Sequence, residues 1–524
     1  MTLYSDVGLG IGYKVAMITA PFTMPKTLVE SNALVLEMRF VIEKLQLQIA
    51  TLKRARFGSS SEAVDSIVDQ MELTLEDLIT EQAAILQNQP DIDKAIADAE
   101  EKKKPVRKPL PEHLPRDVTE HLPNDGICDC CGKALHKIGE DITEVLDYVP
   151  ASFRVKRHVR LKMACRACDI IKQAPAISLP IEKGKPGPGL LANVLVSKYA
   201  DHLPLYRQSG MYAREGVEIS RNTMADWVGR SMELVRPLVD TIGKHVIAGP
   251  AIHTDDTPVP VQAPGSGKTK TGRIWTYLRD ERDWQGDAAP AAYYQYSPDR
   301  KGARPQDHLK EYQGFLHADG YAGYEKLYGS GKITEVACMA HVRRKFVDIH
   351  KANGSPLAEE AITRIAALYA IEKQIRRQPP DIKRSVRQKH AKPLFEALQK
   401  WLPTQLNKIP AKSTLAGAIR YAITRLKRLE VYLTDGRLAI DNNPAERCMR
   451  PIALGRKNFL FYGSDKGGER AAAAYTLLET AKLNRINPQA YLTWVLGTIA
   501  DHPINRIDEL LPWNFSKSEL KEAA

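Results

Sequence analysis

Apolar positions near the start of the chain follow a heptad rhythm. Alternating steps of three and four residues fall on apolar side chains with one serine as the exception. The positions are Leu28, Ser31, Val35, Met38, Ile42, Leu45, Ile49 and Leu52. This spacing is typical of a coiled coil, and the helix ends where Gly58 and a run of serines follow. We predict a self-associating coiled coil over residues 27–57, with an amphipathic helix packed on its own domain as the alternative; residues 1–26 stay unassigned.

The following segment is polar and ends in "EEKKKPVRKPLPEHLPRD" at residues 100–117. Alternating charge and proline favour an extended tether, so residues 58–117 are interpreted as a linker that could also touch phosphates.

Two Cys-x-x-Cys pairs with 33 residues between them follow the linker. Four thiolates in such pairs can surround one Zn²⁺, and Gly132 permits the tight turn behind the first pair. Strand-like sequence separates the pairs, so residues 118–180 are predicted to form a zinc ribbon with structural Zn²⁺. The predicted ligands are Cys128, Cys131, Cys165 and Cys168.

Residues 181–245 alternate between short helical patterns and breaks such as "REGVEIS". Ser220 is a suitable N-cap for a helix that begins with Arg221 and Asn222. A turn between two short helices, the second with a polar and basic start, suits insertion into a DNA major groove. We predict a helix-turn-helix-like DNA-binding region, with helix packing alone as the alternative.

The pattern then changes to strands. The runs "AIHTDDTPVPV", "GRIWTYLRD" and "AAYYQYSP" predict an antiparallel meander, and a helical "PQDHLKEY" precedes strand-like "GFLHA" and "ITEVACMA". Residues 246–350 are therefore the first part of a core, and residues 351–435 are a basic helical insertion. Two helices around a strand-like "KNFLFY" close the core over residues 436–482, and residues 483–524 form a C-terminal helical segment. This order indicates a multidomain α/β protein with a core of ribonuclease-H type.

The chain carries a formal charge of +12 over 524 residues. This excess favours a polyanionic partner, with nucleic acid ahead of a membrane surface. The sequence contains no run of 18 apolar residues, and its crowded cysteines favour metal binding in a reducing compartment, so we expect a cytoplasmic protein.

Phosphate binding by "GSGKT" is an alternative active site, because Lys268 follows a glycine as in a nucleotide-binding loop. The position five before Gly267 is Gln262 instead of glycine, and the sequence after Lys268 is strand-like instead of helical. A hairpin loop is therefore the preferred interpretation.

Carboxylates on separate segments are the stronger candidate site. Asp255 on the first strand and Asp319 at the end of a later strand could share two divalent ions. Glu446 could supply the third carboxylate, although Asn443 and Pro444 before it are also typical of a helix cap with Glu446 closing a capping box. Further contenders for the third position are Glu469 and Glu479.

Several motifs in one order carry a resemblance to a known family. They are the heptad seam, the two cysteine pairs, "LPLYRQ", "ISRNTMADW", "TDDTPV", "HADGYAGY", "AHVRRKF", "NNPAERCMRPIALGRKNFLF", "ETAKLNRINPQAYL" and "LLPWNF". Together they resemble transposases of the insertion sequence 66 family from Leu28 to Phe515. The chain departs from the family at Asp256, where glutamate is common, which leaves Asp256 as a rival for Asp255.

The resemblance implies a DDE transposase with a ribonuclease-H-like core. Its catalytic acids fall on Asp255, Asp319 and Glu446, which would hold two Mg²⁺ (or Mn²⁺) ions for DNA cleavage and strand transfer. Basic side chains would bind phosphates near the cleaved bond, and their alternative is a solvated basic face. These residues are His341, Arg343, Arg344, Lys345, Arg447, Arg450, Arg456 and Lys457.

The resemblance also implies DNA partners, namely the element ends and the target, assembly as a homo-oligomer, and companion proteins from the same element. A DNA-binding regulator or inactive relative that leaves DNA uncut is the alternative function. Cys338 and His341 resemble half of a metal site, but the sequence shows no partner near them.

Overall fold

The computed structural model describes residues 178–182, 184–263 and 267–515, together with 153, 155, 162–164, 171–173 and 265. The predicted coiled coil, the linker and the four predicted zinc ligands lie outside these residues. Within the predicted zinc ribbon, β1 (Lys162–Ala164) pairs antiparallel with β2 (Ile171–Gln173). These two strands bracket the second cysteine pair in the sequence.

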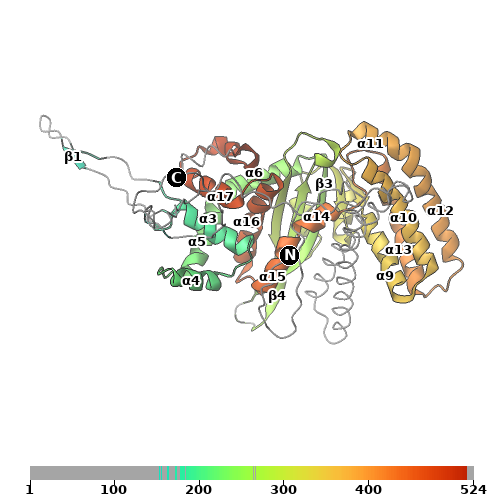
Figure 1. The fold of residues 1–524 in the computed structure, drawn as a ribbon, viewed down its shortest axis with the longest axis horizontal. Helices are drawn as coiled ribbons and strands as arrows, with labels where there is room; N and C mark the ends of the chain where they lie inside the picture. The colour runs from blue at the N-terminus through green and yellow to red at the C-terminus, as the bar shows by residue number, and fades with distance from the viewer. Residues whose placement is uncertain are drawn as a thin grey trace, which may run out of the picture. The chain divides into compact units, whose positions relative to one another are not determined.

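A mixed sheet of five strands lies among the described helices, in the order β5-β4-β3-β6-β7 (Figure 1). The predicted meander is confirmed: β3 (Ala251–Gln262), β4 (Thr269–Arg279) and β5 (Ala291–Ser297) are antiparallel. After α7 (Ala303–His308), β6 (Gly314–Ala318) and β7 (Ile333–Ala337) add parallel strands beside β3. Between them lie η5 (Ala322–Tyr324) and α8 (Glu325–Tyr328).

The β3–β4 hairpin decides against the phosphate-loop alternative. β4 begins at Thr269, directly after Lys268, so a strand stands where a phosphate loop requires a helix N-terminus. Gly265 and Gly267 adopt φ values of +82° and +64°, which suit a hairpin turn. The hairpin interpretation is therefore confirmed.

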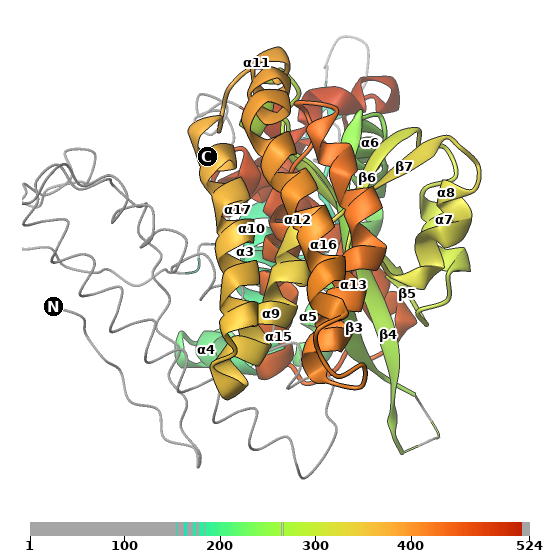
Figure 2. The same ribbon diagram turned by 90° about the vertical axis from the view of Figure 1, so that its right-hand side faces the viewer.

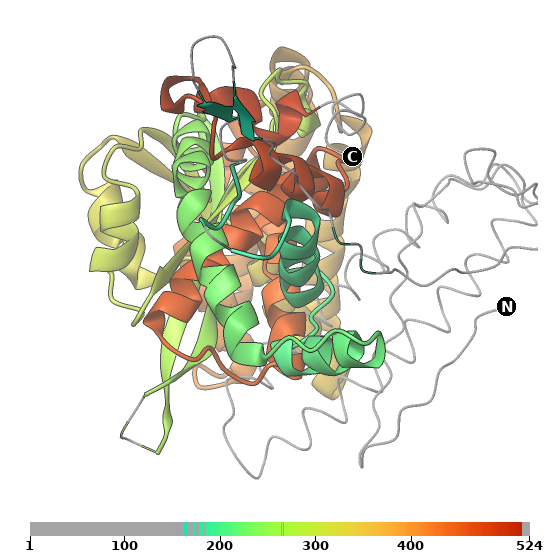
Figure 3. The ribbon, with the colours of Figure 1, turned by 90° about the vertical axis from the view of Figure 1, so that its left-hand side faces the viewer.

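Helices from both ends of the described chain cover one face of the sheet (Figure 3). They are α3 (Pro188–Tyr199), α4 (Leu205–Arg214), α5 (Arg221–Leu234), α6 (Arg236–Ile247), α16 (Asp465–Leu483) and α17 (Pro488–Thr498). α6 and α16 pack directly on β4 and β5. The hydroxyls of Thr476 and Thr480 on α16 accept the N–H groups of Tyr294 and Ala292 at 3.0 and 3.2 Å. The outer edge of β5 thereby finds hydrogen-bond partners that an edge strand otherwise lacks.

Ser220 caps α5 as the sequence predicts. Its hydroxyl accepts the N–H of Thr223 at 3.1 Å, and the helix begins at Arg221. Beyond α17, the short turns η8 (Ile504–Leu510) and η9 (Pro512–Asn514) end the described chain. None of the described helices is long and apolar enough to cross a membrane.

A helical bundle stands at the β7 side of the sheet, and Figure 2 shows it facing the viewer. It comprises α9 (Met339–Asn353), α10 (Pro356–Gln374), α11 (Pro380–Val386), the π-turn η6 (Arg387–Ala391), α12 (Lys392–Leu406), α13 (Thr414–Leu429) and η7 (Glu430–Leu433). Phe346, Leu368 and Phe395 are fully buried in its core. This core continues into Val336 of β7 and Ile440, so the bundle and the sheet share apolar packing.

Arg387 is the buried polar anchor of the bundle. Its guanidinium is 0% exposed and binds both carboxylate oxygens of Glu372, at 2.8 and 2.6 Å. It also donates to the carbonyls of Tyr432, Asp435 and Leu438 at 2.8 to 2.9 Å. One side chain therefore connects α10 to the segment that leaves the bundle.

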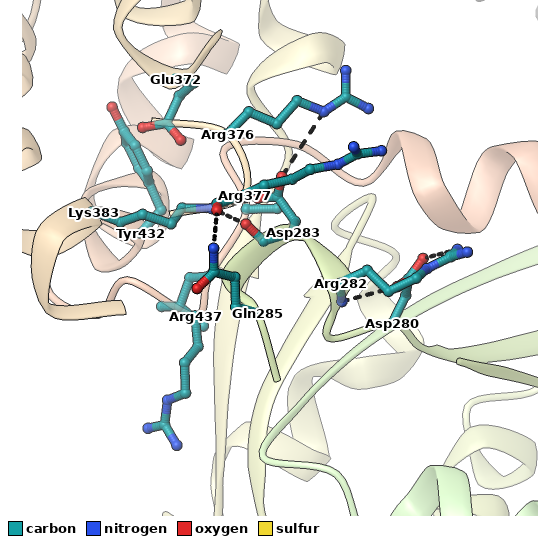
Figure 4. Close-up of polar contacts among 12 residues, drawn as sticks. Asp280, Arg282, Asp283, Gln285, Glu372, Arg376, Arg377, Lys383, Tyr432 and Arg437 are labelled. Atoms are coloured by element: carbon teal, nitrogen blue, oxygen red, sulfur yellow. Dashed lines mark hydrogen bonds and ion pairs between the residues drawn. The ribbon is translucent and has the colours of Figure 1, made fainter. Parts of the chain in front are cut away.

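The bundle also contacts the connection between β4 and β5 (Figure 4). Asp283 of η4 (Arg282–Trp284) binds the ammonium of Lys383, and its carbonyl accepts the N–H of Arg377 at 2.9 Å. Gln285 donates its side-chain N–H to the carbonyl of Arg377 at 2.7 Å. These contacts fix the bundle at a second point of the sheet.

The closing segment differs from the predicted pattern at "KNFLFY". The helix α14 (Asn443–Cys448) is followed by α15 (Arg450–Asn458), which includes the first two residues of this run. Tyr462 then forms a single bridge to Val261 instead of a strand. Its N–H and carbonyl pair with Pro260 and Gln262 at 2.9 and 2.8 Å. The prediction of a strand is wrong, because only Tyr462 of this run pairs with β3.

Replacing Arg387 with methionine should lower the free energy of unfolding by about 3–5 kcal/mol, because the Glu372 carboxylate would remain buried without its partner. The matched control is Arg230→Met, since Arg230 pairs with Asp226 at 2.9 Å on an exposed surface. That control should cost less than about 1 kcal/mol. Denaturant unfolding of both variants tests this, and equal costs would show that Arg387 is not an anchor.

Candidate active site

Asp255 and Asp256 are neighbours on β3 that differ in their partners. Asp256 is 2% exposed and lies 2.8 Å from Nη2 of Arg300 and 3.3 Å from Nη1 of Arg273. The carboxylate of Asp255 instead accepts the backbone N–H of Asp256 at 2.8 Å. Successive side chains of a strand point to opposite faces, so only one of the two can face a given site. Two guanidinium groups pair with Asp256, although burial still raises the pKa of its carboxyl above the ordinary value.

The pairing of β3 with β6 brings Asp319 beside Asp255. His253 stands opposite His317 in this parallel register, and each aspartate follows two residues later in its chain. Asp319 directly follows β6 and keeps 28% of its side chain exposed. Its Oδ1 accepts the N–H of Tyr321 at 2.9 Å, which fixes the carboxylate in the turn.

Gly320 is required in this turn. Its φ of +83° is rare for residues with a side chain. A Cβ at this position would also meet the guanidinium of Arg425 at 2.4 Å. Nη2 of Arg425 donates to the carbonyl of Gly320 at 3.0 Å, so α13 holds the turn after Asp319.

Glu446 lies on α14, but it does not close the predicted capping box. The helix already includes Asn443, and its N-cap Asn442 makes no side-chain cap hydrogen bond. The amide of Asn442 binds elsewhere: Oδ1 lies 3.0 Å from Nδ1 of His253, and Nδ2 donates to the carbonyl of Thr254 at 2.8 Å. The Glu446 carboxylate is 13% exposed and lies 3.5 Å from Nη2 of Arg344 and 3.8 Å from Nδ1 of His341.

The three acids act on one another electrostatically. Burial raises the pKa of Asp255 well above its ordinary value, and the charges of Asp319, Glu446 and Asp256 raise it further. Clustered carboxylates of this kind are stabilised by divalent cations, which supply the missing positive charge. The acids therefore fit a divalent-metal site. Of the other contenders, Glu479 pairs with Lys482 at 2.8 Å, and neither it nor Glu469 is among the charges that act on Asp255.

Two buried histidines position the strands that carry the aspartates. The rings of His253 and His317 stack with 4.1 Å between their centroids. Nε2 of His317 accepts the N–H of Ala439 at 3.0 Å, and Asn442 contacts His253. β3, β6 and the segment before α14 are therefore joined directly behind the acids.

The predicted phosphate-binding residues differ in exposure, and most of them are partly buried. Arg344 is 13% exposed and contacts Glu446, and Nη1 of Arg456 donates to the carbonyl of Pro258. His341, Arg343, Arg450 and Arg456 are partly buried, whereas Lys345, Arg447 and Lys457 are exposed. Arg221 and Asn222 are exposed at the start of α5.

Sequence reasoning missed two parts of this neighbourhood. Arg300, which binds Asp256, has no motif that distinguishes it from other surface arginines. The sequence shows Cys338 and His341 as half of a metal site without a nearby partner, whereas the structure places Glu446 beside them. More than a hundred residues separate His341 of α9 from Glu446 of α14 in sequence, so spacing gives no signal for this contact.

Four family models match the chain. The model described as "Transposase IS66 family" matches residues 183–470, which is more than half of the chain. "Zinc-finger binding domain of transposase IS66" matches residues 125–169, and "IS66 C-terminal element" matches residues 476–513. "Transposase C of IS166 homeodomain" matches residues 44–119, beginning inside the predicted coiled coil and covering the segment interpreted as a linker.

Similar proteins of Sinorhizobium fredii extend over nearly the whole chain. Uncharacterized protein y4hP is 40% identical, over 91% of this chain and 89% of its own length. Uncharacterized protein y4jD is 37% identical, over 93% of this chain and 97% of its own length. Uncharacterized protein y4qI is 38% identical, over 90% and 89% respectively.

The buried histidines predict an acid-sensitive fold. Burial lowers the pKa of His253 from 6.5 to about 4, so below pH 6.5 the unfolded chain binds a proton that the folded chain does not. Stability should therefore fall as the pH falls. Between about pH 7.5 and pH 5, the wild type should lose about 2 kcal/mol more than His253→Asn.

Unfolding free energies of both proteins at the two pH values test this. The comparison is needed because Asp441, whose pKa burial raises to about 6, contributes with the opposite sign in both proteins. Identical pH dependence in the wild type and His253→Asn would show that His253 is not held neutral.

Proposed function

Because the chain belongs to the IS66 family of transposases, we propose that it cuts DNA at the ends of an insertion sequence and joins the freed 3′-hydroxyl ends to target DNA. The convergence of Asp255, Asp319 and Glu446 is the observation that carries this proposal. Asp255 lies on the central strand β3, Asp319 directly follows its parallel neighbour β6, and Glu446 lies on the late helix α14. Such an arrangement suits phosphoryl transfer with two divalent metals.

The sheet supports a ribonuclease-H-like core for this activity. Three antiparallel strands followed by two parallel ones, in the order β5-β4-β3-β6-β7, agree with the expected order of elements. The helices from α10 to α13 stand between the second and third acids in the sequence, as a helical insertion would.

The three acids would hold two Mg²⁺ or Mn²⁺ ions. Bound there, the ions would supply activation of a water or 3′-hydroxyl nucleophile and stabilisation of the leaving oxygen. The protein's own part is to position the ligands: β3 and β6 hold Asp255 and Asp319, and Arg344 holds the Glu446 carboxylate from one side. Exposed Lys345, Arg447 and Lys457 would contact DNA phosphates around the site.

The remaining parts of the chain would bind and assemble DNA ends. We propose structural Zn²⁺ on Cys128, Cys131, Cys165 and Cys168, which all lie within the matched zinc-finger model. Arg221 and Asn222, at the exposed start of α5, would contact DNA. The coiled coil would pair two copies, and companion proteins of the same element would complete the assembly.

A DNA-binding regulator without strand-transfer activity is the second candidate. The exposed basic start of α5 would serve such a protein as well as a transposase. The repulsion between the carboxylates around Asp255 favours the transposase, because a protein that only binds DNA needs no such cluster of acids.

Strand cleavage of a labelled duplex carrying the DNA that flanks this gene tests the proposal. With Mg²⁺, the wild type should nick the duplex at a defined position, and Asp319→Asn should lower the rate by at least about a thousandfold, because one metal ligand is lost. A matched control is Asp240→Asn, since Asp240 lies on α6 and pairs with Arg236 at 3.3 Å on an exposed surface. Full activity in a folded Asp319→Asn protein would refute the assignment, and binding without cleavage by all three proteins would favour the regulator.

Substitutions of the adjacent Asp255 and Asp256 should have different effects on DNA cleavage and on stability. Asp255→Asn should abolish metal-dependent cleavage while keeping or raising stability, because it removes the buried charge whose pKa is raised. Asp256→Asn should lower stability by weakening the pairs with Arg300 and Arg273, yet retain cleavage at low temperature. Thermal unfolding and cleavage assays on both variants decide this, and the reversed pattern would assign the metal site to Asp256.

A further inference from the structure

A second group of potential metal ligands lies at the same glutamate. Cys338, His341 and Glu446 each offer one ligand atom, and these atoms lie within 4.8 Å of one another. Cys338 is the N-cap of α9, and His341 follows three residues later, so the two side chains stand one helical turn apart on the same face. Glu446 approaches them from α14.

Two of the ligand atoms are buried without a hydrogen-bond partner. They are Oε1 of Glu446 and Nδ1 of His341, which lie 3.8 Å apart. The other carboxylate oxygen, Oε2, lies 3.5 Å from Nη2 of Arg344. Buried polar atoms in proteins are normally paired, so two unpaired atoms that face each other require an explanation. A cation between them would satisfy both.

The third atom is a thiol that is already oriented. The backbone N–H of Asn442 donates to Sγ of Cys338 at 3.1 Å, which fixes the sulfur at the start of α9. Among the described residues, Cys338 is one of two free cysteines, and both are buried. Cys448, the other one, is not part of the group of three ligands.

We propose that Cys338, His341 and Glu446 bind one Zn²⁺ ion. Sulfur, imidazole nitrogen and carboxylate oxygen are the ligands that Zn²⁺ takes in proteins, with a fourth position left for water. Neighbouring ligand atoms around a tetrahedral zinc stand about 3.5 Å apart, so the three side chains would close in slightly on binding. Mg²⁺ prefers oxygen ligands and would not select a site that contains a thiolate.

Zinc at this position would compete with the proposed catalytic metals. Glu446 would be drawn toward Cys338 and His341, and its unpaired oxygen would no longer be free to join Asp255 and Asp319. Zinc binding should therefore inhibit Mg²⁺-dependent DNA cleavage. This regulatory part rests on the proposed function, whereas the binding of zinc does not.

Metal binding by the full-length protein tests the site directly. Purified wild type, Cys338→Ala and the matched control Cys448→Ala are loaded with Co²⁺ as a zinc substitute, dialysed, and measured for bound metal and for thiolate-to-cobalt absorption. The wild type and Cys448→Ala should bind one more ion per chain than Cys338→Ala. Equal metal content in the wild type and Cys338→Ala would overturn the proposal.

A second variant keeps the test decisive if Cys338→Ala does not fold. Glu446→Gln keeps the side-chain shape and removes the charged ligand, so its affinity for Zn²⁺ at this site should fall at least about tenfold. Circular dichroism checks folding, and competition with a chromogenic chelator measures the affinity. Unchanged affinity in a folded Glu446→Gln protein would also overturn the proposal.

Cleavage assays test the inhibition separately. The concentration of Zn²⁺ that halves the Mg²⁺-dependent rate should be at least about tenfold higher for Cys338→Ala than for the wild type and Cys448→Ala, each compared with its own zinc-free rate. Equal inhibition of all three proteins would overturn the competition for Glu446. Failure of the wild type to cut any DNA would refute the proposed function while the metal measurements still decide the zinc site.

Discussion

Repulsion among clustered carboxylates is the constraint on which the region around Asp255 depends. Asp255 is partly buried beside two other acids, and its pKa is raised first by burial and then by the charges of Asp319 and Glu446. An unsupported chain would relieve this repulsion by moving the acids apart. Here the parallel pairing of β3 with β6 fixes the two aspartates, and the stacked histidines with Asn442 fix the approach of α14. The scaffold therefore keeps the charges close until cations can neutralise them.

The helical bundle takes part in this support. Arg425 on α13 holds the carbonyl of Gly320, directly after Asp319. Arg428, on the same helix, lies 2.6 Å from Glu335 of β7 and 2.8 Å from Glu325 of α8. Arg387 then binds the carbonyls of the segment that returns to the sheet. A basic composition in these helices therefore reflects internal ion pairs as well as any contact with DNA.

The sequence predicts those features that depend on local patterns. Strand alternation identified the β3–β5 meander, and capping chemistry identified Ser220 at the start of α5. The sequence does not predict features that depend on tertiary contacts. The capping box expected from Asn443 to Glu446 is absent because α14 already begins at Asn443, and its N-cap Asn442 binds His253, which lies 189 residues away. The aromatic residues of "KNFLFY" predict a strand, because their spacing cannot show that only Tyr462 pairs with β3.

The position of Glu446 in the chain also has a consequence for synthesis. Asp255 and Asp319 leave the ribosome well before α14. The bundle from α10 to α13 must be made after Asp319 and before α14. The hydrogen bonds from Asn442 to His253 and Thr254 can form only after that bundle has been completed. A chain whose translation stops early therefore carries two acids without the third. The order of the elements delays assembly of this cluster until the residues of α14 have been made.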